Sequence, residues 1–139
     1  MKYWSRLQKG EVIETENGVL TPDMILGPER KGLKVTYCTD TRPCENIVSH
    51  AEKSDLFICE GMYGEPDKLE KAKEHKHMTF YEAASMAKAA NVKELWLTHY
   101  SPSLTKPGEY KNEVRKFFPN TVISRDGEMK DLLFTEDGE

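Results

Sequence analysis

Three short apolar runs, each followed by a polar residue, restrict most strongly what this chain can fold into. They cover residues 33–38 (LKVTYC), 55–59 (DLFIC) and 94–98 (ELWLT). Segments of helical periodicity separate the runs, and strands that alternate with helices are typical of an α/β fold with parallel strands. Because the runs are almost continuously apolar, we expect both faces of the sheet to be covered.

Four segments have helical patterns: residues 44–51, 66–76, 79–91 and 110–118. The third is the best defined, because Thr79 and Glu82 form a capping-box pair at its start. Two short strands are expected near the end of the chain, at residues 121–124 and 131–134.

We expect residues 1–139 to form a single domain. Residues 1–32 are an irregular hairpin and strap, in which Asn17-Gly18 favours a tight turn. Residues 33–139 are the α/β core. The chain is long enough for one ordinary domain and too short for two.

The composition is lean for a free-standing domain, with 37% hydrophobic residues and a mean hydropathy of −0.69. Helices can cover one face of the sheet, and little apolar sequence is left to cover the other. This suggests that a partner surface is missing. The net charge of −4 means that the field of the whole chain does not attract nucleic acid or an anionic membrane.

The sequence predicts a cytoplasmic protein without a membrane span. No apolar run approaches the roughly 20 residues that a spanning helix needs. The three cysteines are an odd number without a CxxC pair, so we expect small buried thiols and no disulfide framework.

Polar residues suited to metal binding or acid–base chemistry follow each expected strand. Asp40 follows the first strand, Glu60 the second and His99 the third. The carboxyl ends of parallel strands meet at one edge of a sheet, where ligands of open α/β folds bind. His77 lies in the loop before the capped helix and can reach the same edge. One Asp, one Glu and two His suit a metal site or general acid–base catalysis.

Each of these four residues also has an ordinary structural explanation. Asp40 can cap the helix that follows Pro43, and Glu60 can be a loop acid. His77 can be a solvated residue beside the helix cap, and His99 can be a buried histidine that donates to a backbone carbonyl. Only their joint placement favours a functional site.

The ordered set of motifs resembles ribonuclease Z, the tRNA 3′-processing endonuclease family of the metallo-β-lactamase superfamily. Residues 38–43 (CTDTRP) are similar to its GDTRP-type motif, and residues 59–62 (CEGM) to its HEAT-type segment. Residues 77–79 (HMT) resemble its HST motif, and residues 97–104 (LTHYSPSL) its last metal-ligand motif. With the lead-in at residues 7–11 (LQKGE), the resemblance covers nearly the whole chain.

The resemblance implies roles for the residues at the strand ends. Asp40 corresponds to the carboxylate that bridges two zinc ions, and His99 to a terminal ligand of one zinc. His77 corresponds to the histidine beside the scissile phosphate, and Glu60 would orient it. Two metal ions that clamp a phosphodiester also lower the pKa of a bridging water.

The resemblance also shows what this sequence lacks. The family's His-x-His-x-Asp-His motif is absent, and His50 and His75 are the only other histidines. Because a catalytic zinc normally takes three protein ligands, the ligand set is incomplete. We therefore expect the C-terminal half of a ribonuclease Z, truncated and inactive alone. Its fold would be one ββα-type half of the αββα sandwich, a mixed sheet with helices on one face.

Three functions follow from these observations. The first is a zinc-dependent endoribonuclease that matures precursor tRNA as part of an intact enzyme, with Arg42 and Lys106 meeting phosphates. The second is a non-catalytic interaction module that homodimerises or pairs with a separate N-terminal half. The third, a phosphate- or nucleotide-binding module, has no glycine-rich phosphate loop to support it.

Overall fold

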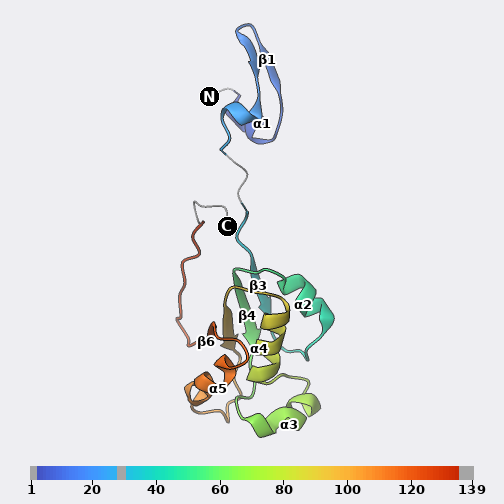
Figure 1. The fold of residues 1–139 in the computed structure, drawn as a ribbon, viewed down its shortest axis with the longest axis vertical. Helices are drawn as coiled ribbons and strands as arrows, with labels where there is room; N and C mark the ends of the chain where they lie inside the picture. Colours follow the sequence, from blue (N-terminus) through green and yellow to red (C-terminus); the bar gives the residue numbers. More distant parts are fainter. Residues whose placement is uncertain (1–2, 28–30, 135–139) are drawn as a thin grey trace. The chain divides into compact units, whose positions relative to one another are not determined.

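The structure is a computed structural model that describes residues 3–27 and 31–134 (Figure 1). The chain divides into two compact units, one within residues 1–32 and the other comprising Leu33–Phe134. The candidate site residues all belong to the second unit.

The first unit contains the predicted hairpin. Its elements are α1 (Trp4–Gln8), β1 (Ile13–Thr15), β2 (Gly18–Leu20) and a 3₁₀ turn, η1 (Pro22–Met24). Strands β1 and β2 pair antiparallel, and Gly18 follows the turn with a φ of 126°, which a residue without a Cβ adopts at little cost. Helix α1 was not expected from the sequence. Residues 28–30 of the expected strap lie outside the described residues.

The second unit is built on a four-stranded parallel sheet. Its strands are β3 (Val35–Cys38), β4 (Leu56–Glu60), β5 (Leu95–Thr98) and β6 (Thr121–Ile123). They lie side by side in chain order, and each pairs parallel with the next. This order places the carboxyl ends of all four strands at one edge. The α/β prediction is confirmed, and the only antiparallel pairing among the described strands is the hairpin of the first unit.

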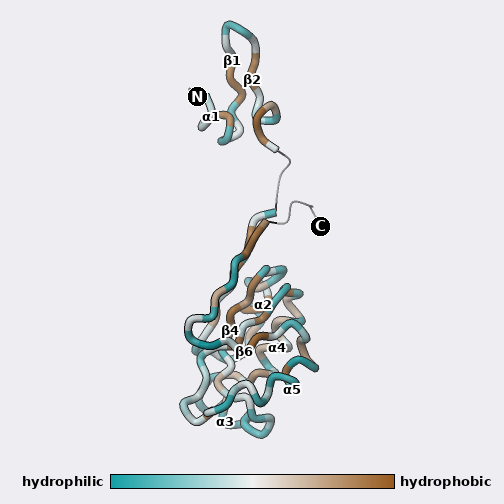
Figure 2. The backbone as a smooth tube through the Cα atoms, turned by 90° about the vertical axis from the view of Figure 1, so that its left-hand side faces the viewer, coloured by the Kyte–Doolittle hydropathy of each residue, from teal (hydrophilic) through white to brown (hydrophobic). Residues whose placement is uncertain are grey.

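The helices of this unit follow the strands. They are α2 (Glu45–Ala51), η2 (Pro66–Lys68), α3 (Leu69–Glu74), α4 (Phe80–Ala89), η3 (Pro107–Tyr110) and α5 (Lys111–Arg115). Figure 2 shows α2, α4 and α5 on one side of the sheet. Within the described part of the chain, no helix is both long and apolar enough to cross a membrane.

Helix α4 forms as its sequence predicts. The Thr79 side chain accepts a hydrogen bond from the backbone N–H of Glu82, and the Glu82 carboxylate accepts one from the backbone N–H of Thr79. This capping box satisfies backbone donors that a helix N-terminus leaves unpaired. Asn91 ends the helix region in the left-handed conformation, with a φ of 50°. The inward face of α4 is fully buried at Phe80 and Ala84.

Two predictions for the last part of the chain were wrong. Residues 131–134 form no strand, because they make no ladder with a neighbouring strand, and Leu133 is 78% exposed. The last helix is shorter than the expected residues 110–118, since α5 begins at Lys111, after η3, and ends at Arg115. Phe117 therefore lies beyond the helix, where its ring packs against Tyr81 with centroids 5.2 Å apart.

The two faces of the sheet differ in their cover. Side chains that point toward the helices are fully buried, including Phe57 and Leu95. On the opposite face, Tyr37, Ile58 and Trp96 stand next to one another in register. Tyr37 is 68% exposed. The expectation that helices cover one face is confirmed, and on the other face Tyr37 is exposed while Ile58 and Trp96 are half-buried.

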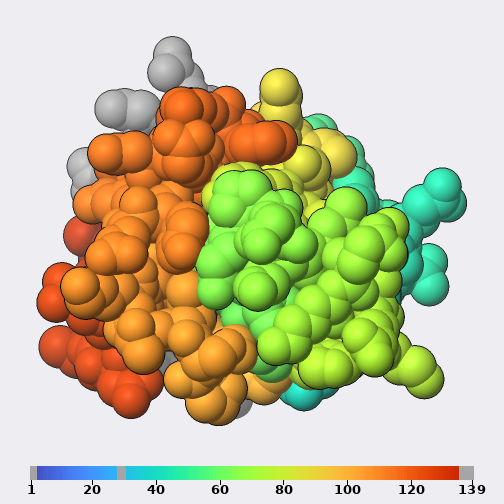
Figure 3. Space-filling view, turned by 90° about the horizontal axis from the view of Figure 1, so that it is seen from below, coloured from blue at the N-terminus to red at the C-terminus, as the bar shows by residue number. Residues whose placement is uncertain are grey.

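The segment η2–α3 and the segment η3–α5 lie side by side at one end of this unit, in green and orange in Figure 3. Their close approach depends on glycine. A Cβ on Gly64 would lie 2.6 Å from Cδ2 of Tyr110, and one on Gly61 would lie 2.7 Å from Cδ1 of Phe80. Both distances are too short for a real contact, so the loop after β4 can pack here only with glycine at these positions.

Candidate metal centre

Asp40 and His99 occupy equivalent positions, one or two residues beyond the ends of β3 and β5. Both adopt the left-handed conformation, with φ values of 56° and 57°. Few residues other than glycine do so, although Asp, Asn and His are enriched among those that do. The turn brings the two side chains together, with His99 Nε2 3.6 Å from Asp40 Oδ1. Strand-end position alone did not predict this turn, although the residue types are compatible with it.

His77 reaches the same place from the loop between α3 and α4. The preceding residue, Lys76, is also left-handed, with a φ of 63°. The rings of His77 and His99 have centroids 5.5 Å apart. One ligand atom each from Asp40, His77 and His99 lies within 4.8 Å of the others. The topology thus assembles three of the four residues that were singled out from the sequence.

The fourth residue, Glu60, lies behind this cluster and is fully buried at the end of β4. One carboxylate oxygen, Oε1, accepts a hydrogen bond from the backbone N–H of Thr41 at 2.7 Å. The other, Oε2, lies 3.1 Å from Nδ1 of His77 and accepts from the backbone N–H of Met78 at 3.1 Å. Because a carboxylate only accepts hydrogen bonds, Nδ1 of His77 carries the proton and Nε2 is left for another partner.

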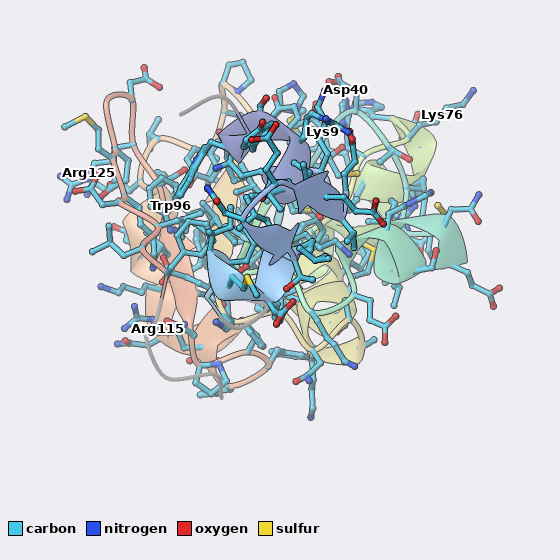
Figure 4. The ribbon with its side chains drawn as sticks, turned by 90° about the horizontal axis from the view of Figure 1, so that it is seen from above. Lys9, Asp40, Lys76, Trp96, Arg115 and Arg125 are labelled. Atoms are coloured by element: carbon cyan, nitrogen blue, oxygen red, sulfur yellow. The ribbon has the colours of Figure 1, made fainter. Side chains whose placement is uncertain are left out.

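The basic residues near the cluster have different surroundings. Arg42 is engaged within the protein, where Nη1 donates to the backbone carbonyl of His77 at 2.6 Å and Nη2 pairs with Glu82. Lys106 is exposed and lies 3.5 Å from Glu109. Figure 4 shows Lys76 pointing outward. The ion pair of Arg42 was not predicted, because its partner lies 40 residues away.

Cys38 and Cys59 face each other in register on β3 and β4, close to the candidate ligands. Their mutual hydrogen bond lowers the pKa of Cys38. The same bond and burial raise the pKa of Cys59, so this buried thiol stays protonated. Cys44 is exposed at the start of α2, and the expectation of buried thiols was wrong for it because the helix begins at the surface.

The donor set fits a divalent metal ion. One carboxylate and two imidazoles are ligands that zinc binds in catalytic sites, where three protein ligands leave a position open. Asp40 and His99 are exposed and His77 is partly exposed, so such a position would be reachable by a substrate. The second ligand set of a two-ion centre is not among the described residues.

Comparisons with known proteins identify the superfamily of this chain. Residues 20–100 match the family model for the beta-lactamase superfamily domain, which is more than half of the chain. The chain belongs to the beta-lactamase superfamily. The match contains Asp40, Glu60, His77 and His99.

Within this superfamily, the similar curated proteins are ribonucleases Z. The chain is 61% identical over 137 residues to ribonuclease Z of Agathobacter rectalis. The aligned region covers 99% of this chain and 45% of that protein. It is 61% identical over 134 residues to ribonuclease Z of Lachnoclostridium phytofermentans, with 96% and 44% covered. The resemblance to ribonuclease Z is confirmed. The chain spans less than half the length of these relatives.

A solved structure supports the superfamily fold. The metallo-beta-lactamase fold protein YhfI from Bacillus subtilis matches with a TM-score of 0.54 and 28% sequence identity. The match covers 63% of this chain and 35% of that one. Again, the chain corresponds to a part of the larger fold.

Proposed function

We propose that this chain supplies part of the active site of a zinc-dependent phosphodiesterase that matures the 3′ end of precursor tRNA in the cytoplasm. The observation that carries the proposal is the convergence of Asp40, His77 and His99, whose ligand atoms lie within 4.8 Å of one another. The identity of 61% to ribonucleases Z supports the substrate class. The cleavage would fall after the discriminator region and leave a 3′-hydroxyl.

In this proposal, each residue has a distinct task. Asp40 and His99 hold the metal, since a carboxylate can span two ions while a neutral imidazole binds one. His77 directs Nε2 toward the scissile phosphate, because Glu60 engages Nδ1 at 3.1 Å. A second proton, taken up at Nε2 in addition to the one at Nδ1, would stabilise the developing charge or pass to the leaving oxygen. Lys106, exposed in the loop after β5, meets a phosphate of the RNA.

Zinc, when bound, would polarise the phosphodiester and make a water molecule acidic enough to supply hydroxide near neutral pH. In this proposal Asp40 and His99 are the metal ligands that this chain offers, and the family's His-x-His-x-Asp-His motif is not in its sequence. We propose that a separate or preceding N-terminal half supplies the remaining ligands. The chain alone then binds zinc weakly and cleaves little or no RNA.

The test compares the pure chain with the chain mixed with a segment that contains the His-x-His-x-Asp-His motif. We expect the mixture to cleave precursor tRNA and to bind zinc stoichiometrically, and the pure chain to do neither. The variant His99→Ala should abolish the gain. His50→Ala is the matched control, because His50 lies on α2 and should leave the gain intact. Stoichiometric zinc and efficient cleavage by the pure chain would contradict the proposal.

A second function is favoured by the uncovered face of the sheet. Val35 and Tyr37 on β3 are 52% and 68% exposed, and the row continues across Ile58 and Trp96. Exposed apolar patches of this kind mark interaction sites. The chain would then be a module that pairs with itself or with a separate N-terminal half.

A further inference from the structure

Arg42 stands two residues after Asp40 but directs its guanidinium into the protein. Nη1 donates to the carbonyl oxygen of His77 at 2.6 Å and to Oε2 of Glu82 at 3.0 Å, while Nη2 pairs with Oε1 of Glu82. The side chains of Arg42 and Glu82 are 29% and 21% exposed. Planar pairing of a guanidinium with a carboxylate through two bonds fixes direction as well as distance.

The carbonyl that Arg42 contacts belongs to the peptide unit between His77 and Met78. The other end of this unit, the N–H of Met78, donates to Oε2 of Glu60 at 3.1 Å. The same oxygen lies 3.1 Å from Nδ1 of His77. One peptide plane is therefore held at both ends, by Arg42 on one side and by Glu60 on the other. Its orientation decides where the His77 ring can lie.

Glu82 extends this arrangement to helix α4. Its Oε2 accepts hydrogen bonds from the backbone N–H of Thr79 at 2.9 Å and from the Thr79 hydroxyl at 3.2 Å. The capping box thus does two things, because the carboxylate that caps the helix also anchors Arg42. The backbone N–H of Thr41 donates to Oε1 of Glu60 at 2.7 Å. Three consecutive residues therefore have three tasks at the site. Asp40 is the candidate ligand, Thr41 bonds to Glu60, and Arg42 bonds to the carbonyl oxygen of His77.

We propose that Arg42 is a positioning residue, which with Glu82 holds the His77–Met78 peptide so that the His77 ring keeps its bond to Glu60. The alternative, in which Arg42 meets an RNA phosphate, requires the guanidinium to leave two partners that it already has. The inference rests on the proposed function for the catalytic role of His77, but the effect of Arg42 on the His77–Met78 peptide can be measured without RNA cleavage. Failure of one is therefore separable from failure of the other.

The test uses the metal-free 139-residue chain with ¹⁵N-labelled histidine, near pH 8, where imidazole is mostly neutral. Long-range ¹H–¹⁵N correlations report which ring nitrogen of His77 carries the proton. In the parent chain we expect the proton on Nδ1. In Arg42→Met we expect a mixture of the two tautomers and at least about tenfold faster exchange of the Met78 amide. Arg42→Lys should restore part of the parent pattern, since it retains one donor.

Two further variants control the result. Arg115 also donates to a backbone carbonyl, that of Thr121 at 3.0 Å, and Figure 4 shows it on the opposite side from Asp40 and Lys76. Arg115→Met should therefore leave both signals unchanged. Glu82→Gln removes the anchor of Arg42 and should change them in the same direction as Arg42→Met, which also covers the case in which Arg42→Met does not fold. Parent signals in both Arg42→Met and Glu82→Gln would overturn the proposal. So would weaker RNA binding by Arg42→Met with an unchanged His77 tautomer.

Discussion

At the scale of single residues, the buried carboxylate of Glu60 is the most constrained group in the site. It accepts two backbone N–H donors, from Thr41 and Met78, and contacts Nδ1 of His77. It is fully buried, so a donor that loses this acceptor has no water to replace it. An unpaired buried donor costs about 1–3 kcal/mol.

We therefore expect Glu60→Gln to lower the free energy of unfolding by about 1–3 kcal/mol, because the amide group turns a donor toward a donor. Glu60→Ala should cost at least about 3 kcal/mol, since both backbone donors lose their partner. Urea denaturation measures both values. Glu70→Gln is the control, because Glu70 is 83% exposed and surface changes stay within about 0.5 kcal/mol. A Glu60→Gln chain as stable as the parent would contradict the assignment.

The sequence predicted which candidate residues lie near one another better than it predicted their contacts. Asp40, Glu60 and His99 follow apolar runs, and the parallel pairing of strands converts that pattern into proximity. Nothing in the pattern pairs Arg42 with Glu82, because their contact depends on how α4 packs beside the end of β3. Direct contacts between residues far apart in sequence require the tertiary fold, which local periodicity does not contain.

At the scale of elements, Tyr100 links β5 to the chain after β6. Its hydroxyl lies within hydrogen-bonding distance of two backbone carbonyls, 2.5 Å from Leu97 O and 2.9 Å from Ser124 O. Burial raises the pKa of Tyr100 to about 12. An ionised tyrosine could not donate to these carbonyls, so the neutral form stabilises the join between the two strands.

This pKa predicts how stability depends on alkaline pH. An unfolded tyrosine ionises near pH 10, so the stabilisation is complete below that value and is lost as pH rises through about 12. The loss should approach about 2–3 kcal/mol. Urea denaturation of the parent and of Tyr100→Phe, from about pH 9 to about pH 11.5, gives the difference in their free energies of unfolding. This difference separates the contribution of Tyr100 from those of the other tyrosines. A difference that does not change with pH would contradict the prediction.

Elements with strong local signals were predictable, and those that depend on context were not. The capping box and the left-handed Asn91 delimit α4 almost as the sequence indicates. Residues 131–134 have strand-like composition, but in the described part of the chain they pair with neither edge strand of the sheet, β3 or β6. The last helix, expected over residues 110–118, follows a 3₁₀ turn at Pro107–Tyr110 and covers only Lys111–Arg115.

At the scale of the whole molecule, the sheet has one covered face and one open face. The lean composition predicted this, because 37% hydrophobic residues are few for a sheet that is apolar on both faces. The exposed Tyr37 is the most accessible aromatic of the open row, at 68%. The sequence of one chain does not encode the identity of a partner that could cover this row.

If the chain is an interaction module that pairs with itself, it should form an isologous dimer through the open face. We expect sedimentation to show a dimer for the parent and a monomer for Tyr37→Arg, because a charge in the row would be buried without a partner. Phe117→Arg is the matched control, since Phe117 is 47% exposed and packs on the helical side with Tyr81. A strictly monomeric parent chain would count against self-association, as would a dimer lost only in Phe117→Arg.

The left-handed strand ends also limit which mutations the site can tolerate. Asp40 and His99 have φ values of 56° and 57°, so a replacement must offer a ligand atom and also accept a conformation that most residues avoid. Asp, Asn and His meet both demands, whereas Glu keeps the charge but fits the backbone less well. Asp40→Glu conserves the charge, but it should therefore disturb the backbone at the site more than Asp40→Asn or Asp40→His does. The residue types tolerated at these two positions are restricted by backbone geometry as well as by metal chemistry. We therefore expect fewer tolerated types than either restriction alone would allow.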